Sequence, residues 1–316
     1  MSARELDAAG ISDPLLRESY EACRRLNAAH GKTYYLATLL LPPEKRPYVH
    51  ALYGFARYAD EIVDDLGSTL DDRDKERWLR SWGDAFLRDL GQGRSDDPVC
   101  RAVVDTALRW DIPREHFEAF LHSMRMDLTV TDYPTYEDLL EYVYGSAAVI
   151  GLQMVPILGA RDAGAYAAAQ DLGIAFQLAN FVRDVGEDLD RGRVYLPLED
   201  LERVGLSRAD LERRVVDDRV RRLLAYEIAR VRDLSRSASA GIPLLAPESR
   251  PCIAAAQELY VGLVDEVERI DSPVFTRRAR TSAARRARVA GPAYLRALAA
   301  RRGRSRSAPL ASSPGR

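Results

Sequence analysis

Residues 55–65 read FARYADEIVDD, and four of the last six side chains are acidic. Residues 50–56, HALYGFA, are mostly apolar and favour a helix that continues into this acidic stretch. Like charges four residues apart weaken a helix by about 0.2–0.5 kcal/mol, and an unpaired carboxylate costs far more to bury. We therefore expect a positively charged ligand at the acidic end of this helix.

The polar residues of this helix share one face. His50, Tyr53, Arg57, Asp60 and Asp64 recur at intervals of three and four residues, which is the spacing of one helical face. The side chains around that face are mostly apolar, whereas an ordinary surface helix has a wider polar side. The narrow polar stripe predicts that the helix lines a polar site within a core.

A second segment repeats this design. In GIAFQLANFVRDVGED, residues 173–188, the polar residues Gln177, Asn180, Asp184 and Asp188 are spaced three, four and four apart between apolar neighbours. Two aspartates one turn apart are common on solvated helices, so the spacing alone indicates little. The informative feature is that both pairs end an apolar helix and continue backward as a polar stripe.

Paired carboxylates on two facing helices are suited to hold Mg²⁺, or Mn²⁺, around a shared anion, because Mg²⁺ favours sites completed by substrate phosphates. The natural anion is a diphosphate, and the apolar, aromatic surroundings favour a lipid chain attached to it. Loss of diphosphate from a prenyl diphosphate leaves an allylic cation. The aromatic faces of Tyr34, Tyr53 or Tyr142 could stabilise such a cation.

Helical periodicity dominates the rest of the chain and predicts an all-α fold without significant sheet. Pro and Gly residues separate the segments. We expect one domain over residues 1–301 and a disordered basic tail over 302–316. The predicted helical segments are residues 14–29, 43–65, 73–90, 98–109, 114–127, 135–157, 162–189, 208–236, 248–270 and 275–301.

Charge is distributed unevenly over the 316 residues. From Ser272 onward there are twelve arginines and no acidic residue, and subtracting their charge from the net charge of −2 leaves residues 1–271 at −14. The basic end indicates an anionic ligand or an anionic membrane surface, or else a solvated helix followed by a disordered tail. Nothing in the charge pattern points to a nucleic acid.

Compartment and membrane topology follow from cysteine usage and hydropathy. Three scattered cysteines without a CxxC spacing fit a reduced, cytoplasmic chain with neither disulfides nor a zinc site. The N-terminus has no apolar signal region, and the longest apolar stretch, residues 145–160, is too short to span a bilayer. We expect a cytoplasmic protein associated peripherally with the inner face of the membrane; its oligomeric state stays open.

Two long stretches resemble the squalene/phytoene synthase family, most closely its bacterial phytoene synthases. They are KTYYLATLLLPPEKRPYVHALYGFARYADEIVDD at residues 32–65 and QLANFVRDVGEDLDRGRVYLP at residues 177–197. The resemblance covers roughly residues 15–300 and implies an isoprenoid-synthase helical bundle around a central apolar cavity. It also implies that Gly151 and Gly173 keep the prenyl tunnels open.

The resemblance also implies roles for individual residues. Asp60, Asp64, Asn180, Asp184 and Asp188 would bind the metals, and the four aspartates with Tyr53 would form the catalytic set. Residues 190–195 would form a flap over the site. The residues expected to contact substrate or diphosphate are Thr33, Tyr34, Arg57, Tyr142, Gln177, Asn180, Arg191, Arg193, Tyr260 and Arg277.

The implied reaction joins two prenyl diphosphates head to head through a cyclopropyl diphosphate. With geranylgeranyl diphosphate the product is phytoene, in carotenoid biosynthesis, and no nicotinamide cofactor is expected. The alternatives are an enzyme that uses C15 substrates to form presqualene diphosphate, squalene or dehydrosqualene, and a non-catalytic prenyl-binding assembly protein. The proton acceptor is not identified: tyrosines and released diphosphate are both open.

Overall fold

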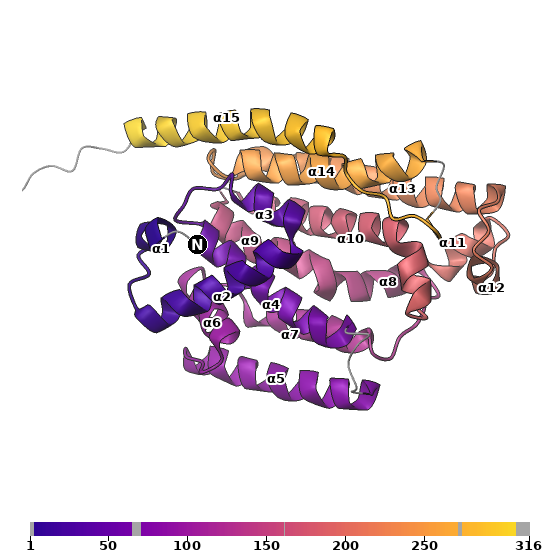
Figure 1. Ribbon diagram of the computed structural model, residues 1–316, viewed down its shortest axis with the longest axis horizontal. Helices are drawn as coiled ribbons and strands as arrows, with labels where there is room; N and C mark the ends of the chain where they lie inside the picture. The colour runs from indigo at the N-terminus through magenta and orange to yellow at the C-terminus, as the bar shows by residue number, and fades with distance from the viewer. Residues whose placement is uncertain (1–2, 65–70, 161, 271–273, 308–316) are drawn as a thin grey trace, which may run out of the picture.

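The computed structural model describes residues 3–64, 71–160, 162–270 and 274–307, apart from the side chains of residues 32, 33, 62, 64 and 304–307. Within these ranges the chain is helical, and one isolated bridge between Asp132 and Val194 is the only extended pairing (Figure 1). The predicted all-α class is confirmed. The elements are α1 (Ala3–Ala8), α2 (Pro14–His30), α3 (Lys32–Thr38), α4 (Arg46–Asp64), α5 (Asp72–Gln92), α6 (Pro98–Arg109), α7 (Arg114–Met126), α8 (Tyr136–Val143), the π-helical turn η1 (Tyr144–Ala148), α9 (Val149–Leu158), α10 (Gly164–Asp190), α11 (Leu198–Arg203), α12 (Arg208–Glu212), α13 (Asp218–Ser239), the 3₁₀ turn η2 (Ile242–Leu244), α14 (Arg250–Arg269) and α15 (Ala283–Ser307).

Several helices differ from the prediction. The segment predicted over 208–236 is divided between α12 and α13, α1 and α11 were not expected, and the helix predicted from residue 275 begins at Ala283. The short helix α3 was not expected, because its sequence KTYYLAT combines aromatic and β-branched residues of modest helix propensity. The segment predicted over 135–157 is interrupted by η1, which has no periodic signature. α15 continues to Ser307, so the expected boundary between domain and tail at residues 301 and 302 falls inside a helix rich in Ala and Arg.

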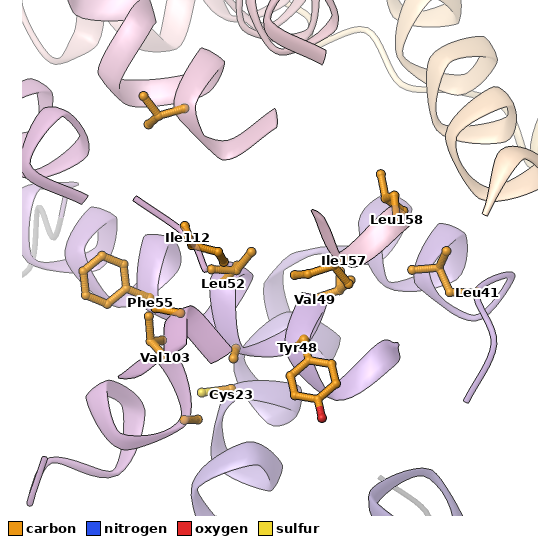
Figure 2. Close-up of a cluster of buried hydrophobic side chains, with 14 of the residues drawn as sticks. Cys23, Leu41, Tyr48, Val49, Leu52, Phe55, Val103, Ile112, Ile157 and Leu158 are labelled. Atoms are coloured by element: carbon orange, nitrogen blue, oxygen red, sulfur yellow. The ribbon is translucent and has the colours of Figure 1, made fainter. Parts of the chain in front are cut away.

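The buried side chains form two clusters that meet along α10. The first gathers around α4, and Figure 2 shows its Leu52 and Phe55 beside Cys23 of α2 and Val103 of α6. The second contains the α10 residue Leu178 together with residues of α8, α11 and α13. Because α4 buries Phe55 in the first cluster, its polar stripe lies on another side of the helix. That side faces α10 across a cavity, which is described below. The shared helix supports our proposal of one domain, although the last helix continues past the proposed end at residue 301.

Glycines allow α10 to pack closely against η1 and α9. A Cβ atom built on Gly173 would lie 2.6 Å from the carbonyl oxygen of Ala147, and one on Gly151 would lie 2.4 Å from that of Ala169. Both glycines border an apolar cavity, and the position that a Cβ atom would occupy faces backbone. The missing side chains therefore set the spacing of the helices beside this cavity.

We expect Gly173→Ala to lower the free energy of unfolding by about 1–3 kcal/mol, because the added methyl meets backbone that cannot rotate away. Gly91→Ala in α5 is the matched control. A Cβ at Gly91 meets nothing within 4 Å, so this variant should be stabilised by a few tenths to about 1 kcal/mol. Urea unfolding followed by circular dichroism measures both. Equal stability of the two variants would contradict the close packing.

A buried ionic cluster lies in the second core. Arg230 is 2.7 Å from Glu227 and 2.9 Å from Asp200, and its guanidinium lies over the ring of Tyr136. Both carboxylates are almost completely buried. Burial raises the pKa of Glu227 from 4.5 to about 7, with a further contribution from Asp200 and against the lowering effect of Arg230. The folded protein therefore holds a proton that the unfolded chain releases.

This proton makes stability depend on pH. Because the pKa of Glu227 is higher in the folded state, its contribution is fully present below pH 4.5 and is lost as the pH rises through 7. As the pH rises from 4.5 to 7, the free energy of unfolding of Glu227→Gln should increase by on the order of 3 kcal/mol relative to that of the parent protein. Unfolding midpoints at several pH values measure this difference. A constant difference between pH 4.5 and 8 would contradict the raised pKa.

One continuous helical stretch, Tyr136–Leu158, is long and apolar enough to cross a membrane by length and composition alone. Of its most apolar window, 56% is buried against other parts of the protein, as expected for a core helix. Its residues line the site described next.

Candidate active site

A polar cavity of about 590 Å³ lies between α4 and α10 and receives side chains from both predicted stripes. The two aspartate-containing helices therefore face one another across a shared space. The predicted side chains that line it are Tyr34, Tyr53, Arg57, Asp60, Tyr142, Gln177, Asn180, Asp184, Asp188, Arg191, Arg193 and Tyr260. The side chains of Thr33 and Asp64 lie outside the described part of the chain.

On α4, the carboxylates are balanced by one arginine. Arg57 donates to Asp60 at 2.5 Å and to Glu61 at 3.2 Å, and Glu61 also lies 3.1 Å from His30. These spacings follow from the helix, since residues three and four apart are neighbours on its surface. The first polar stripe thus presents the paired charges of Arg57 and Asp60 to the cavity.

Three arginines flank the second aspartate pair, which lies on α10. Asp184 accepts hydrogen bonds from Arg183 and, at 2.9 Å, from Arg278, while Arg278 also pairs with Glu187 at 3.2 Å. Asp188 lies 3.8 Å from Arg191. Arg183 thus pairs with its sequence neighbour Asp184, at 2.6 Å.

Arg277, which was predicted to contact diphosphate, does not line the polar cavity. It lines a surface cavity with Arg269 and Arg280, whereas Arg278 lines both that cavity and the polar one. Residues 274–282 form no helix, so no period indicated which of two successive arginines faces the site.

The donor set fits a hard divalent cation that shares its coordination with a substrate. Among the described residues, no three His, Cys, Asp or Glu side chains are grouped closely enough to hold a metal by themselves. Asp184 and Asp188 present carboxylates one turn apart, Asn180 adds an amide oxygen one turn earlier, and Asp60 lies across the cavity. Mg²⁺ needs only one or two protein carboxylates when phosphate oxygens and waters complete its shell.

A buried carboxylate joins two tyrosines at the cavity wall, and sequence analysis did not identify it. Asp127, 8% exposed, accepts hydrogen bonds from Tyr142 at 2.8 Å and from Tyr195 at 2.6 Å. The three residues come from the end of α7, from α8 and from the segment after α10. No local spacing connects them, so only the tertiary fold brings them together.

The tyrosines of the cavity keep their hydroxyl protons. Removal from water raises the pKa of Tyr53 to about 12 and raises those of Tyr142, Tyr195 and Tyr260 further. At neutral pH these side chains are therefore neutral phenols that can donate a hydrogen bond or present an aromatic face.

Two apolar cavities open from the polar one. The first, about 180 Å³, runs between α9, α10 and α14, and the second, about 300 Å³, runs between α4, α7 and α9. Tyr34 and Gln177 line all three cavities. The rings of Tyr34, Phe176 and Tyr260 cluster at this junction, with Phe176 stacked on Tyr260 at 4.2 Å between centroids. The arrangement can hold two apolar chains whose polar ends meet.

His50 lies on the α4 stripe but borders none of these cavities. It is 1% exposed, bonds to Asn27 at 3.0 Å and stacks on Tyr35. Burial lowers its pKa to about 3, so it is a neutral core histidine.

The predicted flap at residues 190–195 contributes Arg191, Arg193 and Tyr195 to one wall of the cavity, whereas its first residue, Asp190, is not part of the lining. Its backbone is held by a hydrogen bond from Val194 to the carbonyl of Thr131, and Arg208 donates to the carbonyl of Gly192 at 2.8 Å.

The fold and the cavity define an isoprenoid-synthase type of enzyme: an all-α bundle that encloses a polar site and its apolar branches. The squalene/phytoene synthase family model matches residues 27–285, and on this basis the chain belongs to the squalene/phytoene synthase family. It is a prenyltransferase that joins prenyl diphosphates head to head, and enzymes of this family use a divalent metal with these substrates.

Individual relatives support this assignment. The chain is 37% identical to phytoene synthase 2, chloroplastic, of Solanum lycopersicum, over 94% of this chain and 96% of that protein. It is 37% identical to the 15-cis-phytoene synthase of Synechocystis, over 89% of this chain and 86% of that protein. A crystal structure of a dehydrosqualene synthase in complex with ligand superposes with a TM-score of 0.81 at 26% identity, covering 90% of this chain and 98% of that one.

Proposed function

We propose that this protein condenses two molecules of geranylgeranyl diphosphate head to head to phytoene, in carotenoid biosynthesis. The observation that carries the proposal is the junction at Tyr34 and Gln177, where two apolar cavities meet one polar cavity. Two lipid chains can then lie apart while their reacting ends meet beside the carboxylates. The identity to phytoene synthases supports the choice of product.

The length of the first apolar cavity favours a C20 chain. Its lining on α10 extends from Gln177 to Ala165, twelve residues or about 18 Å of helix. Sixteen carbons in line, as in a geranylgeranyl chain, span about 18 Å at roughly 1.2 Å per bond, whereas the twelve of a farnesyl chain span about 13 Å.

Arginines at the polar end would bind the diphosphates. Arg57, Arg191 and Arg193 come from opposite walls of the cavity, and a guanidinium matches phosphate oxygens with paired hydrogen bonds. Asp60, Asp64, Asn180, Asp184 and Asp188 would hold Mg²⁺ or Mn²⁺. When bound, the metal neutralises the leaving diphosphate. No nicotinamide is required, because phytoene formation consumes no reductant.

The aromatic junction would stabilise the allylic cation that remains after diphosphate leaves. Tyr34 lines both apolar cavities, and its ring lies against those of Phe176, in the lining of the first apolar cavity, and Tyr260, in the lining of the polar one. The cation then attacks the C2–C3 double bond of the second substrate, and a proton must leave to form the cyclopropyl ring.

We assign proton removal to the hydroxyl of Tyr142 or Tyr195. Each donates its own proton to Asp127, so its oxygen lone pairs can accept a proton from the substrate carbon. As the new O–H bond forms, the original phenolic proton passes to Asp127. The tyrosine stays neutral throughout, which is consistent with its raised pKa.

The experiment supplies purified protein with Mg²⁺ and either geranylgeranyl or farnesyl diphosphate, without NADPH, and identifies products by mass spectrometry. We expect a C40 triene from the C20 substrate. The structural likeness to a dehydrosqualene synthase favours a C15-using enzyme as the second candidate. A C30 product together with no C40 product would establish that candidate. Absence of any product while prenyl binding persists would support a non-catalytic assembly role.

We place the protein in the cytoplasm, at the inner face of the membrane. Its proposed substrates and product are lipids, and the chain is rich in arginine from residue 277 to its end. Both features favour peripheral contact with an anionic bilayer.

A further inference from the structure

The outer face of α15 has an unusual composition for a surface helix. Val289, Ala293 and Ala297 form the buried stripe that packs toward α14. Among the exposed positions from 283 to 303, where the side chains are described, only three carry charge, and all three are arginines. These exposed residues are Ala283, Ala284, Ala287, Arg288, Ala290, Gly291, Pro292, Tyr294, Leu295, Arg296, Ala299, Arg302 and Gly303.

The surface helix α5 provides an internal comparison, at the opposite edge of the molecule in Figure 1. Its exposed residues carry charges of both signs and no large apolar side chain: Asp72, Arg73, Arg77, Arg80, Ser81, Asp84, Arg88, Gly91 and Gln92. On α15, in contrast, Leu295 is 67% exposed and Tyr294 51%. The outer face of α15 is therefore apolar and purely cationic, whereas that of α5 is the mixed face expected in water.

Such a face matches the interface of an anionic bilayer. Apolar side chains enter the boundary between headgroups and acyl chains, while arginine heads reach the phosphates along their flexible stems. At 25 residues, α15 is about 37 Å long, and no acidic residue follows position 271 to oppose the attraction.

The position of α15 brings this face near the substrate cavities. Arg301 donates to the carbonyls of Leu40 and Leu41, which fixes the end of α15 beside the end of α3. α3 carries Tyr34 at the cavity junction and Leu36, which is 45% exposed.

We propose that the outer face of α15 docks this protein on an anionic lipid bilayer. The helix lies in the plane of the interface, with Leu295 inserted and Arg288, Arg296 and Arg302 on lipid phosphates. This inference deepens the proposed membrane location and rests on it. Charge complementarity favours the bilayer over a second copy of the chain, whose α15 would bring arginines against arginines.

The first test measures how much of the parent protein and of two double variants floats with vesicles of phosphatidylcholine containing 30% phosphatidylglycerol. Arg288→Glu/Arg296→Glu should weaken partitioning on the order of thirtyfold, since each basic residue near an anionic membrane surface adds to the free energy of binding. Arg73→Glu/Arg88→Glu on α5 changes the net charge equally and should leave partitioning within about twofold. An equal loss of partitioning in both variants would mean that only the net charge of the protein matters, and this result would overturn the proposal.

The second test measures whether position 295 inserts into the bilayer. Cys23, Cys100 and Cys252 are buried, so a polarity-sensitive fluorophore can be attached to Leu295→Cys or, as a control, to Leu108→Cys on α6, which is 53% exposed in the parent. Vesicles should shift emission to the blue only at position 295. No shift at either position overturns the proposal, as does a shift caused by protein concentration alone, which would indicate self-association.

Activity separates this inference from the proposed function. With substrate in detergent micelles, Arg288→Glu/Arg296→Glu should keep the parental rate, and with substrate in anionic vesicles it should lose at least fivefold. An inactive parent would refute the proposed function and leave the binding tests intact. If the parent protein is active but does not bind vesicles, the docking surface alone would be refuted.

Discussion

Asp184→Asn should lower kcat/KM by on the order of 10³-fold or more, because it removes a charge from the place where the diphosphate must be neutralised. Asp184 is largely enclosed: its side chain is 13% exposed, and it accepts hydrogen bonds from Arg183 and Arg278. Steady-state kinetics at saturating Mg²⁺ measure the loss. Calorimetry with Mg²⁺ and diphosphate should show weakened binding in the same variant.

Asp190→Asn is the matched control for this prediction. Asp190 ends the same helix, is 62% exposed and pairs with Arg214, away from the cavity lining. Its substitution should change kcat/KM by less than about threefold, as expected for an exposed ion pair. If the Asp184 variant folds normally and keeps its activity within tenfold of the parent, the carboxylates do not organise the diphosphate.

Asp127→Asn should reduce kcat by about 10²–10⁴-fold, the range in which a positioned acid–base group contributes. The amide cannot take up the phenolic proton that the proposed relay passes from Tyr142 or Tyr195. KM should change much less, because the proposed role of Asp127 is to take up the proton of Tyr142 or Tyr195 rather than to bind the diphosphate. A solvent isotope effect on kcat should be present in the parent and altered in the variant.

Tyr133→Phe is the control that distinguishes a proton relay through Asp127 from a role of the tyrosine cluster in packing alone. The Tyr133 ring stacks near Tyr195, but its hydroxyl makes no hydrogen bond within the described residues. This variant should retain near-parental kcat, whereas Tyr142→Phe and Tyr195→Phe together should approach the loss seen for Asp127→Asn without adding to it. Equal effects of all three tyrosine substitutions would mean that the cluster acts only through packing.

Sequence periodicity identified the part of the site that lies on long helices. Asp60 and Asp184 were found because a polar stripe on an apolar helix repeats every three or four residues, and both line the cavity. The same pattern grouped His50 with them, although a core contact to Asn27 satisfies its polarity. Periodicity shows which face a residue occupies but not what that face meets.

Features without local periodicity could not be predicted. Arg277 and Arg278 are adjacent in a non-helical segment, so no spacing distinguishes them. The π-helical turn at Tyr144–Ala148 depends on Gly145, where an added Cβ would lie 2.2 Å from the carbonyl of Ala119 on another helix. The cluster of Asp127 joins residues that are 15 and 68 positions apart, and only the packed fold specifies it.

The most direct measurement of the central claim is a crystal structure of the protein with Mn²⁺ and a non-hydrolysable prenyl diphosphate, in which anomalous scattering locates the metal. The account predicts peaks on the diphosphate within about 2.0–2.3 Å of carboxylate oxygens from both α4, at Asp60, and α10, at Asp184 or Asp188. It also predicts the prenyl chain in one of the two apolar cavities. Metal bound by one helix alone, or diphosphate bound away from the aspartates, would contradict it.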